Sequence, residues 1–158
     1  ESTATRPVRV EVAGTARGRV EEWRPLAEER DVDLVVQAPS SAPALAVDGT
    51  VEQIVDGYID NALDAAPSGS TVTVRVDRSP AGVAVHVVDE GPGLDDEQRA
   101  RAFDRFWRGA EVTAPGSGLG LAIISQLARA SGATVALERA GGGGIDAVAV
   151  FRPVDPHP

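Results

Sequence analysis

The chain has 158 residues, of which 42% are hydrophobic, and this is sufficient for one domain with a substantial buried core. Its formal net charge of −9 excludes general nucleic-acid binding, because such binding requires a basic face. The absence of cysteine excludes disulfides and thiolate metal sites, and no uncharged apolar run of about 18 residues is present to span a membrane.

The first third of the chain predicts a strand, a helix and two further strands. Residues 8–12 alternate apolar and polar side chains, as a half-buried strand does. Residues 14–31 carry apolar side chains at helical spacing, and Pro25 predicts a kink or a late start in this helix. Residues 33–38 and 45–47 predict two strands that are joined by the turn P-S-S-A-P.

The clearest helix covers residues 50–66, where apolar side chains recur at i, i+3, i+4 and i+7. Asp48 or Thr50 is positioned to cap its first turn. Asn61 lies at the margin of the apolar stripe. We therefore expect Asn61 to be half-buried and to reach a cavity.

Residues 71–77 and 83–89 predict a β-hairpin around the sequence S-P-A-G. In both strands alternate valines share one face, while polar side chains occupy the other face. This alternation predicts a sheet with helices packed on one face. Neither His86 nor His157 has a carboxylate at a spacing that suggests a pair, so we assign no role to either.

The last part of the chain predicts a short helix, a longer helix and two strands, at residues 95–107, 118–131, 133–138 and 145–151. Asp95 and Gln98 have the spacing of a capping box at the start of the short helix. A G-G-G-G turn separates the two strands, and we expect the Pro-rich tail to be loose.

The first of two glycine-rich turns, V-V-D-E-G-P-G-L, places Asp89 at the end of a predicted strand, before Gly91 and Gly93. A carboxylate in this position can accept a hydrogen bond from the exocyclic amine of adenine, and glycines allow a flat base to approach the backbone. Guanine presents a carbonyl at that point and would be repelled. Taken alone, D-x-G-x-G is also the sequence of a plain turn.

The second glycine-rich turn, G-S-G-L-G-L, opens the predicted helix at residues 118–131. The N–H groups at a helix N-terminus bind anions, and Ser117 adds a hydroxyl donor beside Gly118 and Gly120. The turn also resembles half of a dinucleotide-binding fingerprint. It is not followed, however, by a strand that ends in an acidic residue within a βαβ unit.

Asn61 and an aromatic segment complete the candidate residues. The amide oxygen of Asn61 is a suitable ligand for Mg²⁺, which keeps several waters and takes further ligands from phosphates. A lone asparagine on a helix is more often a surface residue, but the two turns downstream favour the metal role. The sequence F-D-R-F-W-R-G, residues 103–109, predicts a lid held by its aromatic side chains. Because the chain has no lysine, Arg105 or Arg108 would contact phosphate and act with Asn61 in catalysis.

These elements, in this order and at this spacing, resemble the N, G1, F and G2 boxes of the ATP-binding catalytic domain of sensor histidine kinases, in the superfamily shared with gyrase, Hsp90 and MutL. The resemblance covers residues 47–151. It implies the Bergerat ATP-binding fold, an α/β two-layer sandwich with a mixed β-sheet covered on one face by helices. It also implies one domain in a fragment of a longer protein, with a core at about 8–152, an ATP lid at 94–116 and a Pro-rich tail at 153–158.

The resemblance further implies a role for each candidate residue. Asn61 would coordinate Mg²⁺, and Asp89 would bind the amine of the adenine of ATP. Gly91 and Gly93 would line the pocket of the base. The residues that would bind the phosphates are Ser117, Gly118, Leu119 and Gly120.

In the full-length protein the resemblance implies transfer of the γ-phosphoryl group to a histidine of a dimerisation domain, and then to an aspartate of a response regulator. The H-E-x-x-x-P type of acceptor motif is absent from the chain, so we expect the acceptor histidine elsewhere in the protein. A cytoplasmic location is expected for the domain, and a membrane anchor elsewhere in the full-length protein is compatible with it.

Three positions depart from the family pattern: Gly57 replaces an asparagine, Asp64 a cationic residue and Ala65 an aromatic residue. We expect weak nucleotide affinity as a result, with the anion of Asp64 facing the phosphates. The departures keep open a degenerate, non-catalytic nucleotide-binding or regulatory module. An anti-sigma-factor-type serine kinase is a second alternative, which the long lid disfavours. A gyrase-like ATPase is disfavoured because its catalytic glutamate would stand at Gly57.

Overall fold

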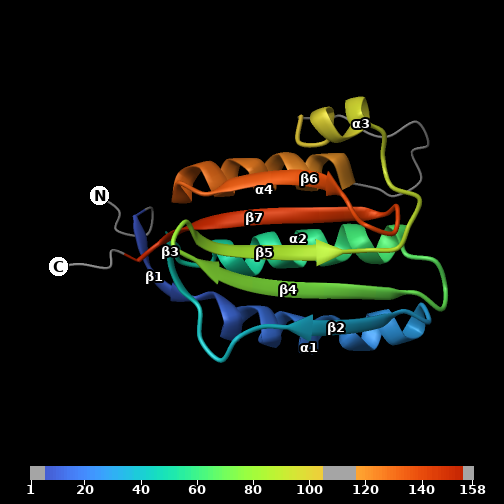
Figure 1. Cartoon of the computed structure of the whole chain (residues 1–158), viewed down its shortest axis with the longest axis horizontal. Coiled ribbons are helices and arrows are strands. Elements are labelled where there is room, and N and C mark those ends of the chain that lie inside the picture. Colours follow the sequence, from blue (N-terminus) through green and yellow to red (C-terminus); the bar gives the residue numbers. More distant parts are fainter. Residues whose placement is uncertain (1–5, 105–116, 155–158) are drawn as a thin grey trace.

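The computed structural model describes residues 6–104 and 117–154, which form four helices and seven strands (Figure 1). In chain order the elements are β1 (Pro7–Glu11), α1 (Val12–Glu29), β2 (Asp33–Gln37), β3 (Pro43–Val47), α2 (Thr50–Ala65), β4 (Thr71–Ser79), β5 (Gly82–Val88), α3 (Asp96–Arg101), α4 (Ser117–Ser131), β6 (Thr134–Arg139) and β7 (Ile145–Pro153). None of the helices in these residues is long and apolar enough to cross a membrane.

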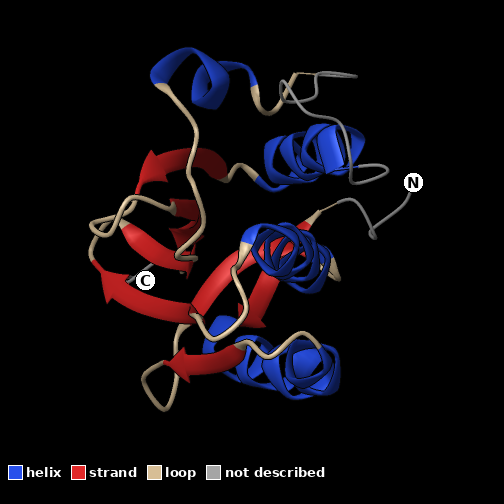
Figure 2. Ribbon diagram, turned by 90° about the vertical axis from the view of Figure 1, so that its right-hand side faces the viewer, coloured by secondary structure: helices blue, strands red, loops and turns tan. Residues whose placement is uncertain are grey.

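All seven strands form one sheet in the order β1-β3-β7-β5-β4-β2, with β6 paired to β7. The sheet is mixed, because β2 and β4 are parallel while the other neighbours are antiparallel. Helices α1, α2 and α4 lie on one face (Figure 2), and no helix among the described residues covers the other face. This is the two-layer α/β arrangement that the sequence predicts.

The alternating valines determine which face of the β4–β5 hairpin is buried. Val74 lies opposite Val87, and Val76 lies opposite Val85. All four are buried, and β7 continues the layer with Ala149 opposite Val85. A slip of one residue would turn these side chains to solvent, so the apolar pattern specifies the register. The predicted one-sided sheet is confirmed.

Helix α2 is central to the core, and its predicted apolar stripe is buried. Its first turn differs from the prediction. The N-cap is Gly49, with a φ of 89°, and no side chain caps the helix, so the prediction of Asp48 or Thr50 as the cap is wrong. Thr50 is instead a buried residue of the helix itself. Packing of the stripe, rather than a cap, stabilises this helix.

Helix α1 begins earlier than predicted, because Glu11 caps it from the preceding strand. The Glu11 carboxylate accepts hydrogen bonds from Ala13 N at 3.1 Å and from Ala42 N at 2.6 Å. Ser41 Oγ donates to the same carboxylate at 2.8 Å, so one side chain joins the start of α1 to the loop before β3. Pro25 lies inside α1, so a late start of this helix is excluded, and the kink stays a prediction.

One end of the molecule brings together segments that are far apart in the chain. The C-terminal ends of α2 and β5, the N-terminal end of α4 and the turn before β7 lie at the right-hand end in Figure 1. Strand β1 and the end of β7 lie at the opposite end. The fold therefore places both glycine-rich segments and the predicted metal ligand at the same end of the sheet.

Candidate nucleotide-binding site

Asp89 directly follows β5 and is 5% exposed. Its Oδ1 accepts hydrogen bonds from Gly91 N at 2.8 Å and from Ile145 N at 3.2 Å. Asp89 N in turn donates to Ile145 O at 3.0 Å. Within the part of the chain that the structure describes, both hydrogen bonds of the carboxylate end on Oδ1. Its Oδ2 therefore remains as the acceptor for a ligand.

The buried carboxylate of Asp89 needs a further hydrogen-bond donor. Burial raises the pKa of its carboxyl group, and the N–H groups of Gly91 and Ile145 oppose this shift. A buried carboxylate that already accepts two backbone N–H groups on one oxygen gains most from a further donor on the other. An exocyclic amine is such a donor.

Gly91 and Gly93 allow the turn after Asp89 to pack against two other segments. A Cβ atom at Gly91 would lie 2.6 Å from Ala65 O, at the end of α2. A Cβ atom at Gly93, which has a φ of 75°, would lie 2.2 Å from Gly143 O. Both distances are too short for a side chain. The turn is therefore held between α2 and the turn before β7 because these two residues are glycine.

The four-glycine turn at residues 141–144, which the sequence predicts only as a turn between two strands, belongs to this site. A Cβ atom at Gly144 would lie 2.2 Å from Asp89 O and 2.6 Å from its Oδ1. The run of glycines was the signal that could have indicated a close approach. Ile145 N was also missed, because it is a backbone group 56 residues from Asp89.

Asn61 lies on α2, one helical turn before Ala65, and it is half-buried as predicted. One turn earlier on the same helix, Gly57 contacts α4. A Cβ atom at Gly57 would lie 2.5 Å from Ile124 Cδ1, so Ile124 fills the space that a side chain here would need. Asn61 thus stands on α2 between the residue that contacts α4 and the residue that contacts the turn after Asp89.

Asp64 has a cationic partner in the structure. Its carboxylate lies 3.1 Å from Arg30 Nη1, at the C-terminal end of α1. We expected this anion to face the phosphates; the structure instead directs it toward α1. The reason is that α1 and α2 pack side by side, which the sequence does not reveal. Asp64 is therefore not an uncompensated anion beside the candidate site.

Helix α4 begins at Ser117, with Gly118, Leu119 and Gly120 in its first turn. The first N–H groups of a helix have no partner within the helix, and together with its dipole they favour an anion. Among the described residues, no atom would lie within 4 Å of a Cβ atom at Gly120. The side chains of Ser117 and Leu119 lie outside the described part of the structure, so the predicted hydroxyl contact stays a prediction.

Of the predicted lid, the structure describes residues 94–104. The predicted capping box of α3 is confirmed: Gln98 N donates to Asp95 Oδ1 at 2.7 Å, and Asp95 N donates to Gln98 Oε1 at 2.9 Å. Phe103 packs against the core, as expected for an anchor of the lid. Outside the described residues lie Arg105, Phe106, Trp107 and Arg108. Their predicted roles stay predictions.

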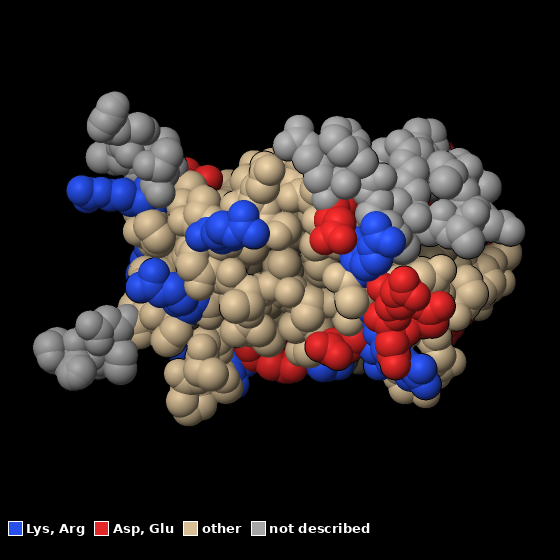
Figure 3. All heavy atoms as spheres, turned by 90° about the horizontal axis from the view of Figure 1, so that it is seen from above, with Lys and Arg blue, Asp and Glu red and all other residues tan. Residues whose placement is uncertain are grey.

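No acidic cluster for a metal ion is present among the residues that the structure describes. No group of three or more His, Asp or Glu side chains there could bind a metal ion. On the face seen in Figure 3, arginine side chains are separated by uncharged surface or stand beside acidic ones. A nucleotide-bound Mg²⁺ needs only one or two protein ligands, so the amide oxygen of Asn61 fits this role.

Comparison with known proteins identifies the family of this chain. The family model of histidine kinase-, DNA gyrase B- and HSP90-like ATPases matches residues 47–155. The chain belongs to this ATPase family. Within the family, it is 33% identical to the sensor protein IrlS of Burkholderia pseudomallei over 119 residues, which are 73% of this chain and 25% of IrlS. This ATPase domain therefore spans about a quarter of the length of that curated relative.

Solved structures agree with this assignment. The ATPase domain resembles a mycobacterial sensor histidine kinase, MprB, with a TM-score of 0.77 and 26% identity over 93% of this chain and 100% of that one. It also resembles full-length ShkA in complex with AMPPNP, with a TM-score of 0.77 and 28% identity over 96% of this chain and 32% of that one. The chain is an ATP-binding catalytic domain of the histidine kinase type, as its sequence motifs predict.

Proposed function

We propose that this domain binds ATP with Mg²⁺ and supplies its γ-phosphoryl group to a histidine on a separate dimerisation domain, for relay to an aspartate of a response regulator. The observation that carries the proposal is the buried carboxylate of Asp89, with its Oδ2 available, at the same end of the molecule as the N-terminus of α4. One site can thus bind a base at one side and phosphates at the other.

For the base, Asp89 Oδ2 would accept the exocyclic amine of adenine. Gly91 and Gly93 would line the pocket of the ring, in a turn that packs against α2 and the turn before β7 because these residues have no side chain. A hydrogen bond to a charged acceptor is worth about 1.5–3 kcal/mol, and an unpaired buried acceptor is costly. Guanine, which presents a carbonyl at this point, would be rejected.

For the phosphates, the backbone N–H groups of Gly118, Leu119 and Gly120 would bind oxygen atoms, with the Ser117 hydroxyl as a further donor. Asn61 would hold Mg²⁺ through its amide oxygen, and the bound ion would neutralise phosphate charge. Arg105 and Arg108 of the lid would contact the transferred group. Phosphoryl transfer depends mainly on positioning and charge stabilisation, so no further nucleophile is required of this chain.

The similarity to ShkA, whose solved structure is in complex with AMPPNP, supports an adenine nucleotide as the ligand. We place the domain on the cytoplasmic side, where ATP and a response regulator are available. The division of the chain into a core, a lid at residues 94–116 and a tail remains part of the proposal.

Calorimetric titration of this domain with ADP and a non-hydrolysable ATP analogue, with and without Mg²⁺, tests the proposal. Asp89→Ala should abolish the binding of both nucleotides, while Asn61→Ala should remove the gain that Mg²⁺ provides. Gln53→Ala is a matched control, because Gln53 is an exposed amide on the same helix. In the full-length protein, ATP should yield an acid-labile phosphohistidine.

The opposite result has a specific meaning. Absence of binding at millimolar nucleotide would contradict the kinase proposal and favour a non-catalytic regulatory module. The surroundings of Gly57 favour this second candidate, because Ile124 occupies the space that an asparagine side chain, usual for the family at this position, would need.

A further inference from the structure

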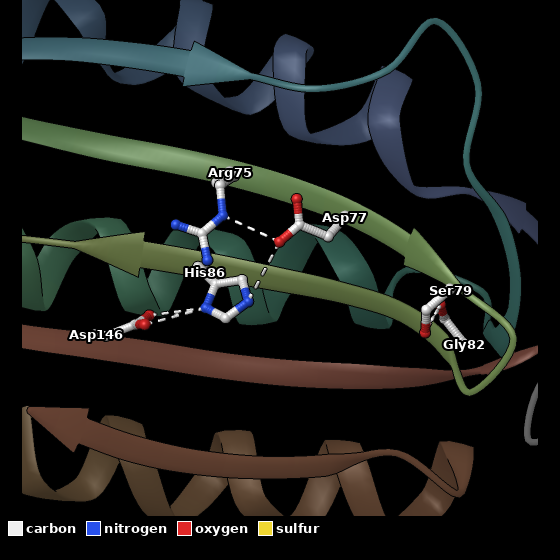
Figure 4. A network of polar contacts seen from close by, with 6 residues as sticks. All are labelled: Arg75, Asp77, Ser79, Gly82, His86 and Asp146. Carbon is white, nitrogen blue, oxygen red and sulfur yellow. Dashed lines mark hydrogen bonds and ion pairs between the residues drawn. The ribbon is translucent and has the colours of Figure 1, made fainter. Parts of the chain in front are cut away.

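A row of four polar side chains crosses three strands on the face of the sheet that no described helix covers (Figure 4). Arg75 Nε lies 3.0 Å from Asp77 Oδ2 on β4, and the same oxygen lies 3.7 Å from His86 Nε2 on β5. His86 Nδ1 lies 3.0 Å and 3.1 Å from the two carboxylate oxygens of Asp146 on β7. The spacing in the sequence did not indicate this pair, because Asp146 is 60 residues away from His86.

This row reaches the candidate site through Asp146. Asp146 directly follows Ile145, whose N–H and C=O groups are both hydrogen-bonded to Asp89. His86 lies on β5, three residues before Asp89, which directly follows this strand. A closed ring therefore runs from His86 along β5 to Asp89, across to Ile145, and back through the Asp146 carboxylate to the imidazole.

The segment before Ile145 needs such a tie, because it consists of four glycines. Glycine backbone is the most flexible, and a glycine turn loses the most conformational entropy when it is ordered. The turn's own hydrogen bonds, from Gly143 N to Ala140 O and from Ala140 N to Gly144 O, join it to itself and not to β5. Beside the site, the β5–β7 ladder begins with Val88 opposite Asp146.

The His86–Asp146 pair is partly shielded from water, with side-chain exposures of 17% and 20%. A partly shielded hydrogen-bonded pair holds its geometry better than an exposed ion pair does. In the tautomer with a proton on Nδ1, the imidazole donates to Asp146. Asp77 faces the other ring nitrogen, and Arg75 neutralises this second carboxylate.

We propose that His86 and Asp146 form a positioning pair for nucleotide binding. The pair holds the Ile145 N–H group against Asp89 Oδ1, so that Oδ2 points to the amine of adenine. This inference rests on the proposed function and assigns it two further residues. Neither residue contacts the nucleotide; both act through Ile145 and Asp89.

The test compares His86→Val, Asp146→Val and the double variant with the wild-type domain. Valine suits a strand, and Thr134→Val is a matched control on the same face of β6. Each single variant should bind ADP roughly 3- to 10-fold more weakly, the effect of losing about one hydrogen bond, and the double variant should be no worse than either single. His86→Asn, which keeps a donor near the position of Nδ1, should recover part of the affinity.

A second readout does not depend on nucleotide. Amide hydrogen exchange of Ile145 and Gly91 in the free domain should become faster in His86→Val and in Asp146→Val, but not in Thr134→Val. Unchanged exchange at Ile145, or additive losses of ADP affinity in the double variant, would overturn the positioning role. Failure of the wild type to bind ADP would instead contradict the proposed function, while the exchange data would still decide whether the pair orders this backbone.

Discussion

Replacement of Asp89 by asparagine should separate nucleotide binding from folding. The amide oxygen of Asn can accept the hydrogen bonds that Gly91 N and Ile145 N now donate to Oδ1. An NH₂ group then replaces Oδ2, so that a donor faces the amine of adenine. Loss of a hydrogen bond to a charged acceptor costs about 1.5–3 kcal/mol, which corresponds to roughly 10- to 150-fold weaker ADP binding.

The free energy of unfolding should not fall in the same variant. Burial raises the folded-state pKa of Asp89 above its ordinary value of 3.8, so the folded state binds a proton more readily than the unfolded state. As the pH rises from the ordinary pKa through the raised folded-state pKa, ionisation of the carboxylate therefore lowers the free energy of unfolding. Asparagine removes that cost, so Asp89→Asn should be at least as stable as wild type at neutral pH. For wild type, ADP affinity should decrease as the pH falls through the raised pKa.

Calorimetric titration with ADP over a pH series, together with thermal unfolding followed by circular dichroism, checks both parts. Asp89→Ala is the contrasting variant, because it leaves two partly buried N–H groups without their acceptor, at a cost of about 1 kcal/mol each. The reasoning is refuted if Asp89→Asn binds ADP as tightly as wild type, or if it melts below Asp89→Ala.

Two further predictions concern stability. Gly93→Ala places a Cβ atom 2.2 Å from Gly143 O at a φ of 75°, so urea unfolding should show a loss of about 1–3 kcal/mol and calorimetry a loss of ADP binding. Gly18→Ala lies at an exposed position of α1, where the new Cβ atom would meet no described atom within 4 Å, so it should instead stabilise by about 0.5–1 kcal/mol. Equal effects of the two changes would contradict the packing argument. Glu11→Ala should cost about 1 kcal/mol at pH 7, since it removes an N-cap. Burial raises the pKa of Glu11, but hydrogen bonds led by that from Ala42 N–H lower it more. The stability lost in Glu11→Ala should therefore shrink as the pH falls below 4.5. A loss that does not depend on pH would contradict this account.

Local patterns in the sequence were sufficient for most elements of the fold. The stripe of α2, the alternating valines of β4 and β5, and the Asp95–Gln98 capping box are short-range features, and the structure confirms each of them. The errors occurred where packing overrides local preference. Helix α1 starts earlier than predicted, and α2 begins at Thr50 after Gly49, an N-cap without a side-chain hydrogen bond.

The candidate site was only partly predictable, for a related reason. Asp89, Gly91 and Gly93 are adjacent in the chain, so their motif identified them. The partners of Asp89 are not adjacent to it: Gly144 and Ile145 reach it only because β7 pairs with β5 in one register.

By itself, the sequence determined the elements, the one-sided sheet and the family, because periodicity, turn residues and motif spacing are properties of neighbouring residues. Only the tertiary structure decided which distant groups meet. It joined His86 to Asp146, Asp64 to Arg30, and Gly57 to Ile124. Each of these contacts depends on strand register or helix packing, which arise from the burial of the whole core and not from any local segment.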